Sequence, residues 1–311
     1  MNIVFLDAET LGNDVSLEPI SSLGNYVSYP STAPELTVER SNGAEVVITN
    51  KVWFGAQEMD SLPELKLICV AATGMNNVDL VAAAERGIAV RNAIDYSTQS
   101  VVQVTFMHIL NLVGHGKEFD EYVKSGKYSE SGCFTEVSMP FYELNGKKIG
   151  IIGLGNIGSK VAAIATAFGM QVAYFPTSGK AHSDLYPALD LETLLGESDI
   201  VTIHCPLNDR TKDLITGREL AKMKPEGYIV NMGRGGIINE KDLAESLDNG
   251  VIAGAAVDVF SKEPLPAGHP YLGMEHPERL ILSPHIGWAS REARVCLIGK
   301  IAANIKDVMG V

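Results

Sequence analysis

Three polar residues in the second half of the chain are of the types that bind a carboxylate and move a proton. Arg234 stands between glycines, and its planar guanidinium can hold a carboxylate through two parallel hydrogen bonds. His285 follows an apolar segment and a proline, and its imidazole can exchange a proton near neutral pH. If Glu263 meets His285, its carboxylate would orient the ring and raise the histidine pKa. Each residue alone also fits a structural or solvated role, so the residue types leave both interpretations open.

A glycine loop lies upstream, between an apolar strand-like segment and a helix-like one. Its G-x-G-x-x-G pattern spans residues 153–158. Gly153 allows a tight turn, Gly155 lets the backbone approach phosphates, and Gly158 lets the helix pack close to the strand. The amides of the helix N-terminus would then face an anion. The pattern predicts a dinucleotide site rather than an ordinary glycine-rich turn, with these contact residues: Gly153, Gly155, Asn156, Ile157 and Gly158.

The candidate side chains follow apolar segments that alternate with helix-compatible ones. Strands are predicted at 149–152, 172–175, 200–204, 228–231, 253–258 and 280–282, and helices after the glycine loop and at 191–195, 217–223 and 240–247. This alternation predicts a doubly wound parallel sheet, which binds ligands at the carboxyl ends of its strands. Arg234, Glu263 and His285 each follow a late strand, so we expect them at that edge.

The glycine loop begins only after about 150 residues, enough for another domain. Strands predicted at 3–6, 46–49, 67–71 and 88–90, with a helix at 78–85, indicate a second α/β lobe. One long helix over 97–124 is expected to connect the lobes, and a final helix over 291–309 to pack on the first lobe. We therefore predict two Rossmann-like or flavodoxin-like α/β lobes with parallel sheets: a discontinuous substrate domain of residues 1–95 and 288–311, and an inserted dinucleotide-binding domain of residues 96–287.

The composition is that of a soluble globular protein, with 46% hydrophobic and 20% charged residues. No apolar run approaches the ~20 residues of a membrane span, and the N-terminus lacks the features of a signal peptide. The net charge of −13 argues against nucleic acid or anionic membrane as a partner. The cysteines have no metal-ligand spacing, so we expect buried reduced thiols, no metal and a cytoplasmic location: Cys69, Cys133, Cys205 and Cys296.

The remaining histidines and one tryptophan are weaker candidates. His204 ends a strand beside Cys205 and Pro206, where it could border a cofactor, although a backbone role for that turn fits as well. Trp288 could line a small substrate pocket or fill a core. The other histidines lie along the long helix or in polar loops: His108, His115, His182, His269 and His276.

Together these segments resemble the D-2-hydroxy acid dehydrogenase family over essentially the whole chain. The loop 153–158 is similar to the family's nucleotide loop, and arginine, glutamate and histidine in this order after it are specific for the family. Segments 71–74 and 285–290 are most similar to the glycerate dehydrogenase/hydroxypyruvate reductase branch. The resemblance implies an oxidoreductase that uses NAD(P)(H) to interconvert a small 2-oxo acid and its D-2-hydroxy acid, with hydroxypyruvate or glyoxylate and D-glycerate or glycolate as the expected pairs.

The resemblance also implies a role for each polar residue. Arg234 would hold the substrate carboxylate, His285 would act as acid and base, and Glu263 would be its partner. Asp258 would contact the nicotinamide end of the cofactor. The resemblance implies further cofactor contacts at His204, Cys205, Pro206, Thr211, Met232 and Gly233, and substrate contacts at Thr73, Gly74 and Arg234, to which the candidate pocket residue Trp288 is added.

One departure from the family bears on the choice of cofactor. Phe175 stands where the family often has an aspartate that binds the adenosine ribose, and no acid follows until Asp184. Without that carboxylate a 2′-phosphate is not repelled, and Thr177, Ser178 and Lys180 could bind it. We therefore expect NAD(P)(H) with a slight preference for NADP(H).

Two rival functions are also compatible with the sequence. One is a different chemistry on the same scaffold, such as oxidation of formate or phosphite, or activity of the lactate or phosphoglycerate type. The other is a non-enzymatic dinucleotide-sensing protein, which would not need an acid–base pair. The resemblance further implies a homodimer formed through the cofactor lobe and the helix 97–124.

Overall fold

The computed structural model describes residues 1–181 and 183–311, so His182, predicted in a loop, lies outside the described residues. The chain forms two compact units: Met1–Thr98 with Trp288–Val311, and Gln99–Gly287. Each unit is an α/β layer structure around one parallel sheet, which confirms the predicted fold class. Within the described ranges, we find no helix whose length and apolar character would let it cross a bilayer.

The sheet of the first unit has the order β2-β1-β3-β4-β5, the flavodoxin-like arrangement, and all its pairs are parallel. Its strands are β1 (Asn2–Phe5), β2 (Asn25–Ser28), β3 (Val46–Thr49), β4 (Leu67–Val70) and β5 (Ala89–Arg91). The sequence did not predict β2, because this edge strand is largely exposed and has no apolar run. The other four strands lie within one residue of their predicted positions at either end.

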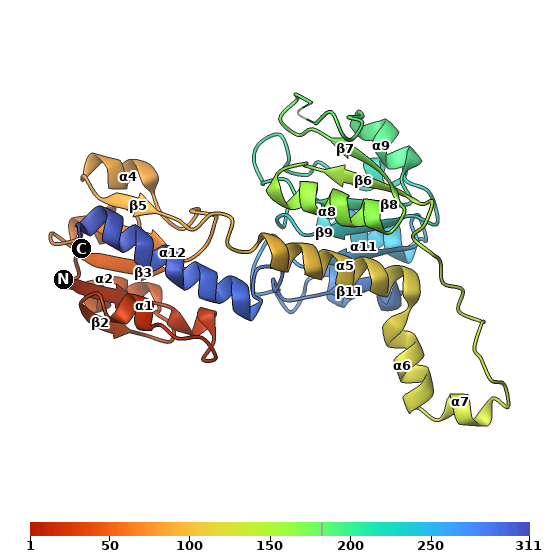
Figure 1. Cartoon of the computed structure of the whole chain (residues 1–311), viewed down its shortest axis with the longest axis horizontal. Helices are drawn as coiled ribbons and strands as arrows, with labels where there is room; N and C mark the ends of the chain where they lie inside the picture. Colours follow the sequence, from red (N-terminus) through yellow and green to blue (C-terminus); the bar gives the residue numbers. More distant parts are fainter. Residues whose placement is uncertain (182) are drawn as a thin grey trace. The chain divides into compact units, whose positions relative to one another are not determined.

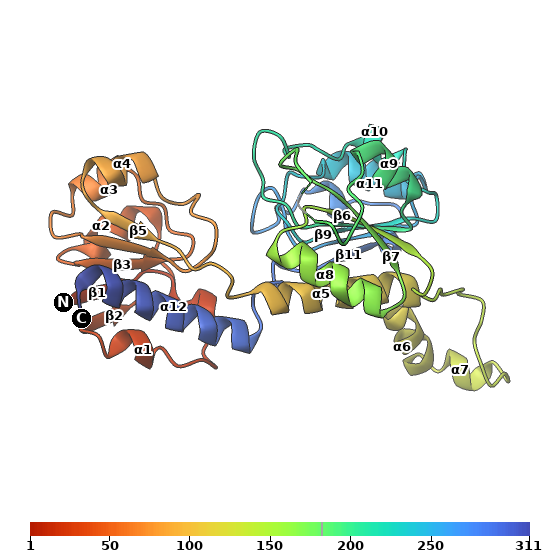
Figure 2. The same ribbon diagram turned by 45° about the horizontal axis from the view of Figure 1, so that its top comes forward.

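Helices cover both faces of this first sheet (Figures 1 and 2). One face carries α1 (Glu18–Ser21) and α12 (Arg291–Met309), whose Leu297 and Ile301 are fully buried. The final helix therefore packs on the first unit, as predicted. The other face carries α2 (Thr37–Ser41), α3 (Ala56–Asp60) and α4 (Leu80–Glu85), and two 3₁₀ turns complete the unit, η1 (Ala8–Leu11) and η2 (Pro34–Leu36).

The sheet of the second unit has the order β11-β10-β9-β8-β6-β7 with parallel pairs throughout. Its strands are β6 (Lys148–Ile152), β7 (Gln171–Phe175), β8 (Ile200–Ile203), β9 (Tyr228–Asn231), β10 (Gly254–Val257) and β11 (Leu280–Leu282). The chain leaves β6 towards β7 on one side and returns to β8 on the other, so the strand order reverses at β6. A doubly wound sheet binds its ligand at such a reversal, outside the carboxyl ends of the strands.

Two sets of helices cover the faces of the second sheet. Helices α5 (Thr98–Gly114) and α8 (Asn156–Ala167) lie side by side on one face (Figures 1 and 2), where Phe106 stacks on Phe168 with ring centroids 5.6 Å apart. The other face carries α9 (Leu191–Glu197), α10 (Gly217–Leu220) and α11 (Glu240–Asp248). Shorter elements complete the unit: α6 (Gly116–Lys124), α7 (Lys127–Glu130), η3 (Pro270–Leu272) and η4 (Pro277–Arg279).

Two expectations from the sequence are wrong. The single helix over 97–124 is broken into α5 and α6 at His115, whose φ of 49° is left-handed. The glycines on either side of His115 explain the break, because glycine is a poor helix former. The four thiols are also not all buried: Cys69 and Cys205 are, and burial raises their pKa values to about 12 and about 11, but Cys133 and Cys296 are exposed.

Candidate active site

His285 and Glu263 form a direct pair at the carboxyl ends of two neighbouring strands. His285 follows β11 and Glu263 follows β10, and the two strands are paired in register. The imidazole Nδ1 lies 2.7 Å from Glu263 Oε2. Because an ionised carboxylate only accepts hydrogen bonds, Nδ1 carries the proton and donates it, which leaves Nε2 for a ligand. The two side chains are 25% and 27% exposed, so a small molecule in solution can reach the pair.

Asp258 holds the turn that carries His285. Its carboxylate is 2% exposed and follows β10. Oδ1 accepts hydrogen bonds from the Ser283 hydroxyl at 2.5 Å and from Ile286 N at 2.9 Å, and Oδ2 accepts from Gly287 N at 2.8 Å. These bonds stabilise His285 in a left-handed conformation, with φ of 54°. Asp258 therefore positions His285, whereas its predicted contact with the nicotinamide stays a prediction.

A buried histidine extends this arrangement into the core. His108 on α5 is 1% exposed, and its Nε2 lies 2.9 Å from the Ser283 hydroxyl. Burial lowers the pKa of His108, with a smaller opposing effect from the charge of Asp258. The ring is therefore neutral near pH 7, and the hydrogen bond ties α5 to the turn that bears His285.

Arg234 lies in a tight loop that follows β9. The buried side chain of Asn231 shapes this loop: its Nδ2 donates to Arg234 O at 3.0 Å, and its Oδ1 accepts from Gly233 N at 3.1 Å. The Arg234 side chain is exposed, and its Nη1 donates to Gly233 O at 2.9 Å. Four of the five guanidinium N–H groups stay available for a ligand.

The arginine loop packs tightly against the loop that carries Glu263. A Cβ atom placed on Gly235 would overlap the backbone of Phe260 and Ser261, so only glycine fits there. Phe260 N in turn donates to Glu263 Oε1 at 3.0 Å. The distance between the arginine and glutamate loops is therefore fixed by backbone contact.

A second carboxylate, that of Glu240, holds the Glu263 loop through hydrogen bonds to Ser261. Glu240, the first residue of α11, accepts from Ser261 N at 2.6 Å and from the Ser261 hydroxyl at 2.5 Å. Its Oε2 also lies 2.9 Å from Nε2 of His269, and both side chains are largely buried. Glu240 thus fixes the loop that holds the partner of His285.

The glycine loop between β6 and α8 has the three features that a dinucleotide needs. Gly153 has a φ of 92°, and a Cβ there would lie 2.8 Å from Cys205 N. A Cβ on Gly158 would overlap Gly153 O, so the helix packs directly on the loop. A Cβ on Gly155 would meet nothing within 4 Å, so the backbone there faces open space. With the first-turn amides of α8, this loop fits the pyrophosphate of a nicotinamide dinucleotide.

The segment after β8 lies directly beside this loop. His204 is held by Thr202, whose hydroxyl is 2.9 Å from its Nε2, and desolvation lowers the pKa of His204 to about 3, so the ring is neutral. Its Nδ1 is buried and has no hydrogen-bond partner among the described residues. The hydroxyl of Thr211 donates to Pro206 O at 2.6 Å and shapes the turn. Contacts of these residues and of buried Cys205 with a cofactor stay predictions.

The other predicted contact residues are distributed over both units. In the second unit, Met232 is buried next to the position of Gly287, and Thr177 and Ser178 follow β7, where Ser178 is exposed. Thr73, Gly74 and Trp288 belong to the first unit. There the Thr73 hydroxyl donates to Ala93 O at 3.0 Å, and Trp288 packs edge-on against Tyr96.

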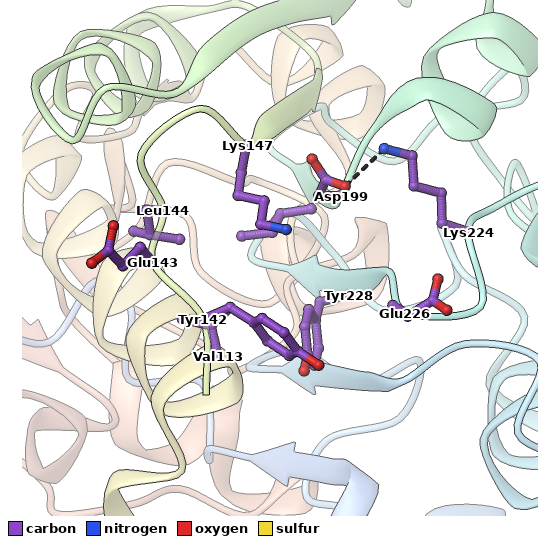
Figure 3. A pocket seen from close by; sticks show the side chains of 10 residues that line it. Val113, Tyr142, Glu143, Leu144, Lys147, Asp199, Lys224, Glu226 and Tyr228 are labelled. Carbon is purple, nitrogen blue, oxygen red and sulfur yellow. Dashed lines mark hydrogen bonds and ion pairs between the residues drawn. The ribbon is translucent and has the colours of Figure 1, made fainter. Parts of the chain in front are cut away.

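A cavity of about 250 Å³ in the second unit lies apart from these residues (Figure 3). It lies at the amino ends of the strands, because Lys147, Asp199 and Tyr228 precede or begin β6, β8 and β9. Lys224 is paired there with Asp199 at 2.7 Å. The catalytic candidates follow the opposite, carboxyl ends of the strands. We therefore do not assign this cavity to the active site.

Reasoning from the sequence missed three residues that shape the site: Asn231, Glu240 and Ser283. Asn231 and Ser283 are buried polar residues at or directly after the end of a strand, and a polar residue that closes an apolar run is a signal that could have identified them. Glu240 gave no such signal, because acids are common in the first turn of helices. Over the two described ranges, no group of three or more His, Cys, Asp or Glu side chains is arranged to hold a metal ion.

Comparison with known proteins identifies relatives along the whole chain. The model of the NAD-binding domain of D-isomer specific 2-hydroxyacid dehydrogenases matches residues 106–287. A glycerate dehydrogenase of Methylorubrum extorquens is 36% identical over 312 residues, 98% of this chain and 95% of its own. A hydroxypyruvate reductase of Blautia hydrogenotrophica is 34% identical over 315 residues, 99% of this chain and 97% of its own. A solved structure of an acyclic imino acid reductase with NADPH and D-Arg has a TM-score of 0.87 at 26% identity, covering 100% of this chain and 97% of that one.

The matched domain covers more than half of the chain, and its relatives span nearly all of it. The glycine loop and the paired histidine and glutamate lie within or at the edge of the matched range. The family predicted from the sequence is thus confirmed: this chain belongs to the D-isomer-specific 2-hydroxyacid dehydrogenases and is an oxidoreductase that depends on a nicotinamide dinucleotide.

Proposed function

We propose that the chain reversibly reduces hydroxypyruvate or glyoxylate to D-glycerate or glycolate with NADH or NADPH. The observation that supports this most is the contact of 2.7 Å between His285 Nδ1 and Glu263 Oε2, because the loop of Glu263 packs against the loop of Arg234. The names of the two relatives that align along the whole chain, a glycerate dehydrogenase and a hydroxypyruvate reductase, support the substrate class.

In the proposed reaction, each residue of the second unit has one task. Arg234 binds the substrate carboxylate through the N–H groups that its bond to Gly233 leaves available. His285 hydrogen-bonds the substrate oxo oxygen through Nε2 and donates the proton, while Glu263 holds the ring by Nδ1. The bound dinucleotide supplies the hydride. Arg234 also draws electron density from the carbonyl, which favours attack at its carbon.

The first unit supplies the remaining proposed substrate contacts: Thr73, Gly74 and Trp288. In the described part of the chain, Gly74 N–H and Met75 N–H donate to no protein acceptor. Two such amides in one half-buried turn suit an anionic carboxylate. The Thr73 hydroxyl is used by Ala93 O, so we assign the carboxylate to the backbone of this turn rather than to that hydroxyl.

The cofactor is proposed to be NADP(H) in preference to NAD(H). Phe175 ends β7 and packs against the core, so no carboxylate stands there to bind ribose hydroxyls or repel a 2′-phosphate. The related imino acid reductase was solved with NADPH, which supports the preference.

The direct test is the oxidation of NADH and NADPH, each followed by nicotinamide absorbance in the presence of hydroxypyruvate or glyoxylate. We expect oxidation of both cofactors, faster with NADPH. His285→Ala should lower kcat by several orders of magnitude, roughly 10³-fold or more, with cofactor affinity unchanged. The matched control is His276→Ala, because His276 forms an exposed pair with Glu278 at 3.1 Å and precedes β11, at the opposite end of that strand from His285.

Two results would contradict the proposal. Near-normal turnover of His285→Ala would exclude this residue as the acid. Binding of either cofactor without oxidation on any 2-oxo acid would favour a dinucleotide sensor. Arg234→Ala should chiefly raise KM for the oxo acid, and an unchanged KM would exclude the arginine as the carboxylate ligand.

We further propose that the chain is a homodimer that uses the segment 116–146. Its apolar side chains are unusually exposed: Phe134 is 91% exposed, Val137 77% and Phe141 63%. Apolar groups of this size in one segment indicate a surface covered by a partner. Light scattering should give twice the mass of the chain, and the combined Phe134→Ser and Phe141→Ser change should give the monomer. A monomeric wild type would refute the dimer.

We also propose a cytoplasmic location. All four cysteines are free thiols, including Cys133 and Cys296 at the surface, which suits a reducing compartment. Fractionation of the source cells should place the oxidation activity with the cytoplasmic enzymes, and its recovery from an oxidising compartment would refute this.

A further inference from the structure

The loop after β7 is joined by an arginine from a different part of the chain. Arg210 lies in the turn that follows β8, 32 residues beyond Ser178 in sequence. Its Nη1 donates a long hydrogen bond of 3.4 Å to Ser178 O. The guanidinium therefore reaches across from the carboxyl end of one strand to that of another. Because β8 and β7 flank β6, these two loops lie on either side of the strand that ends in the glycine loop.

The turn that carries Arg210 is held in place by its own hydrogen bonds. Asn208 N donates to the Thr211 hydroxyl at 2.8 Å, and Arg210 N donates to Asn208 Oδ1 at 2.9 Å. Thr211 is 1% exposed and anchors the turn to the core. The backbone of Arg210 is thus fixed, while its side chain is exposed and can move onto a ligand.

The guanidinium is largely unused. Within residues 1–181 and 183–311, the ion pairs of the structure do not include Arg210, and its one hydrogen bond is at the weak end of the usual range. Four N–H groups are therefore available, in a planar fork that matches two oxygens of a phosphate. In a chain of net charge −13, such a cation is the kind of group that a dianionic ligand needs.

The ligand for this fork follows from the loop that it contacts. The segment 176–179 forms a tight turn closed by Gly179 N and Pro176 O at 2.8 Å, and it presents the side chains of Thr177 and Ser178. In a dinucleotide fold, the loop after this strand meets the adenosine ribose. Phe175 leaves no acid there. A group that adds negative charge to the ribose would find hydroxyls and a guanidinium instead of a carboxylate.

We infer that Arg210 binds the 2′-phosphate of NADP(H) and sets the cofactor preference of the enzyme. The inference rests on the proposed function, because it takes the glycine loop as the cofactor site. The hydroxyls of Thr177 and Ser178, which belong to the loop that Arg210 contacts, would complete the phosphate site. The choice between NADP(H) and NAD(H) then depends on a residue that follows β8, and not only on the loop after β7, where the sequence analysis located the candidate phosphate contacts.

Calorimetric titration of the full chain with 2′,5′-ADP and with 5′-AMP tests the inference without turnover. These ligands differ only in the 2′-phosphate. We expect the wild type to bind 2′,5′-ADP at least about tenfold more tightly than 5′-AMP. Arg210→Gln should remove most of that difference and leave 5′-AMP binding within about twofold. Arg210→Lys, which keeps the charge and loses the fork, should fall between.

Lys212→Gln is the matched control, because Lys212 is an exposed cation in the same turn. It should leave the preference for 2′,5′-ADP unchanged. If Arg210→Gln and Lys212→Gln weaken 2′,5′-ADP equally, the effect is general electrostatics and the inference is overturned. It is also overturned if the wild type binds both nucleotides equally, or if Arg210→Gln weakens both equally.

Kinetics separate failure of this inference from failure of the proposed function. If Arg210→Gln reduces hydroxypyruvate with unchanged KM values for NADPH and NADH, the function stands and the role of Arg210 is refuted. If neither the wild type nor any variant reduces a 2-oxo acid, the proposed function fails. The nucleotide titrations still decide whether Arg210 binds the 2′-phosphate.

Discussion

Replacing Gly235 by alanine should separate the two loops that form the catalytic site. The new Cβ would overlap backbone atoms of Phe260 and Ser261, which cannot rotate away as a side chain could. To restore van der Waals separation, the arginine and glutamate loops must move apart by on the order of 1 Å. A displacement of that size away from the reacting atoms can lower turnover by ~10²-fold. The overpacking itself should cost about 1–3 kcal/mol of unfolding free energy.

The neighbouring glycine provides the control for this change. Gly236 has a φ of 79°, so alanine there is strained, but its Cβ would meet only a side-chain carbon of Leu207 at 4.0 Å. Gly236→Ala should therefore lower stability by about 1 kcal/mol and leave kcat within a few fold. Thermal unfolding and steady-state kinetics on both variants, at saturating cofactor, separate the two effects. If Gly235→Ala keeps the kcat of Gly236→Ala, the spacing of the loops does not control turnover and the reasoning is refuted.

Three further perturbations test the hydrogen-bond networks around the site. Asp258→Asn places an amide donor where a buried carboxylate accepts hydrogen bonds from backbone N–H groups. The substitution should lower the free energy of unfolding by about 1–3 kcal/mol and also lower kcat. An unchanged melting temperature and an unchanged kcat would contradict the role of Asp258 in holding the His285 turn. Glu240→Gln should weaken the hydrogen bonds that hold Ser261, so kcat should fall by roughly tenfold while cofactor affinity stays constant. An equal loss of kcat and cofactor affinity would indicate general unfolding instead. The folded-state pKa of His204 is about 3, below the ordinary 6.5, so unfolding takes up a proton between these two pH values. The free energy of unfolding should therefore fall as the pH falls below 6.5, by at most about 1.4 kcal/mol per pH unit. His204→Gln should reduce this slope.

The sequence predicted the strands of the buried sheets better than anything else. Strands β3, β9 and β11 have the predicted ends, because each is a short apolar run between polar residues. The edge strand β2 was missed because its sequence has no apolar run, and only its parallel pairing with β1 makes it a strand. The break at His115 was missed for a related reason: apolar spacing continued across the glycines, and periodicity alone does not register a left-handed residue.

The position of the candidate site was predictable from the sequence, but of its contacts only the pair of Glu263 and His285 was expected, and that expectation came from the family resemblance. Residues after late strands of a doubly wound sheet must lie at one edge, which was enough to propose Arg234, Glu263 and His285. That Glu263 reaches His285 depends on β10 pairing directly with β11, and no residue pattern gives that neighbour relation. The contact between Gly235 and the backbone at Phe260 is likewise a three-dimensional fact, because a glycine beside an arginine reads in sequence only as a flexible turn.

The place of α12 has a consequence for how the chain folds during synthesis. The core of the first unit includes residues near Ile3 and residues near Ile301, so it stays incomplete until the last helix leaves the ribosome. The second unit, Gln99–Gly287, is continuous and has its whole core earlier. We therefore expect the cofactor unit to become protease-resistant on stalled nascent chains that are cut at residue 287 and extended by a linker long enough to span the ribosomal tunnel, while the N-terminal strands are still cleavable. Equal resistance of both would contradict this order. Residues 1–98 are translated before the second unit and would then fold after it, so a nascent chain could already hold its dinucleotide while this segment still depends on chaperones.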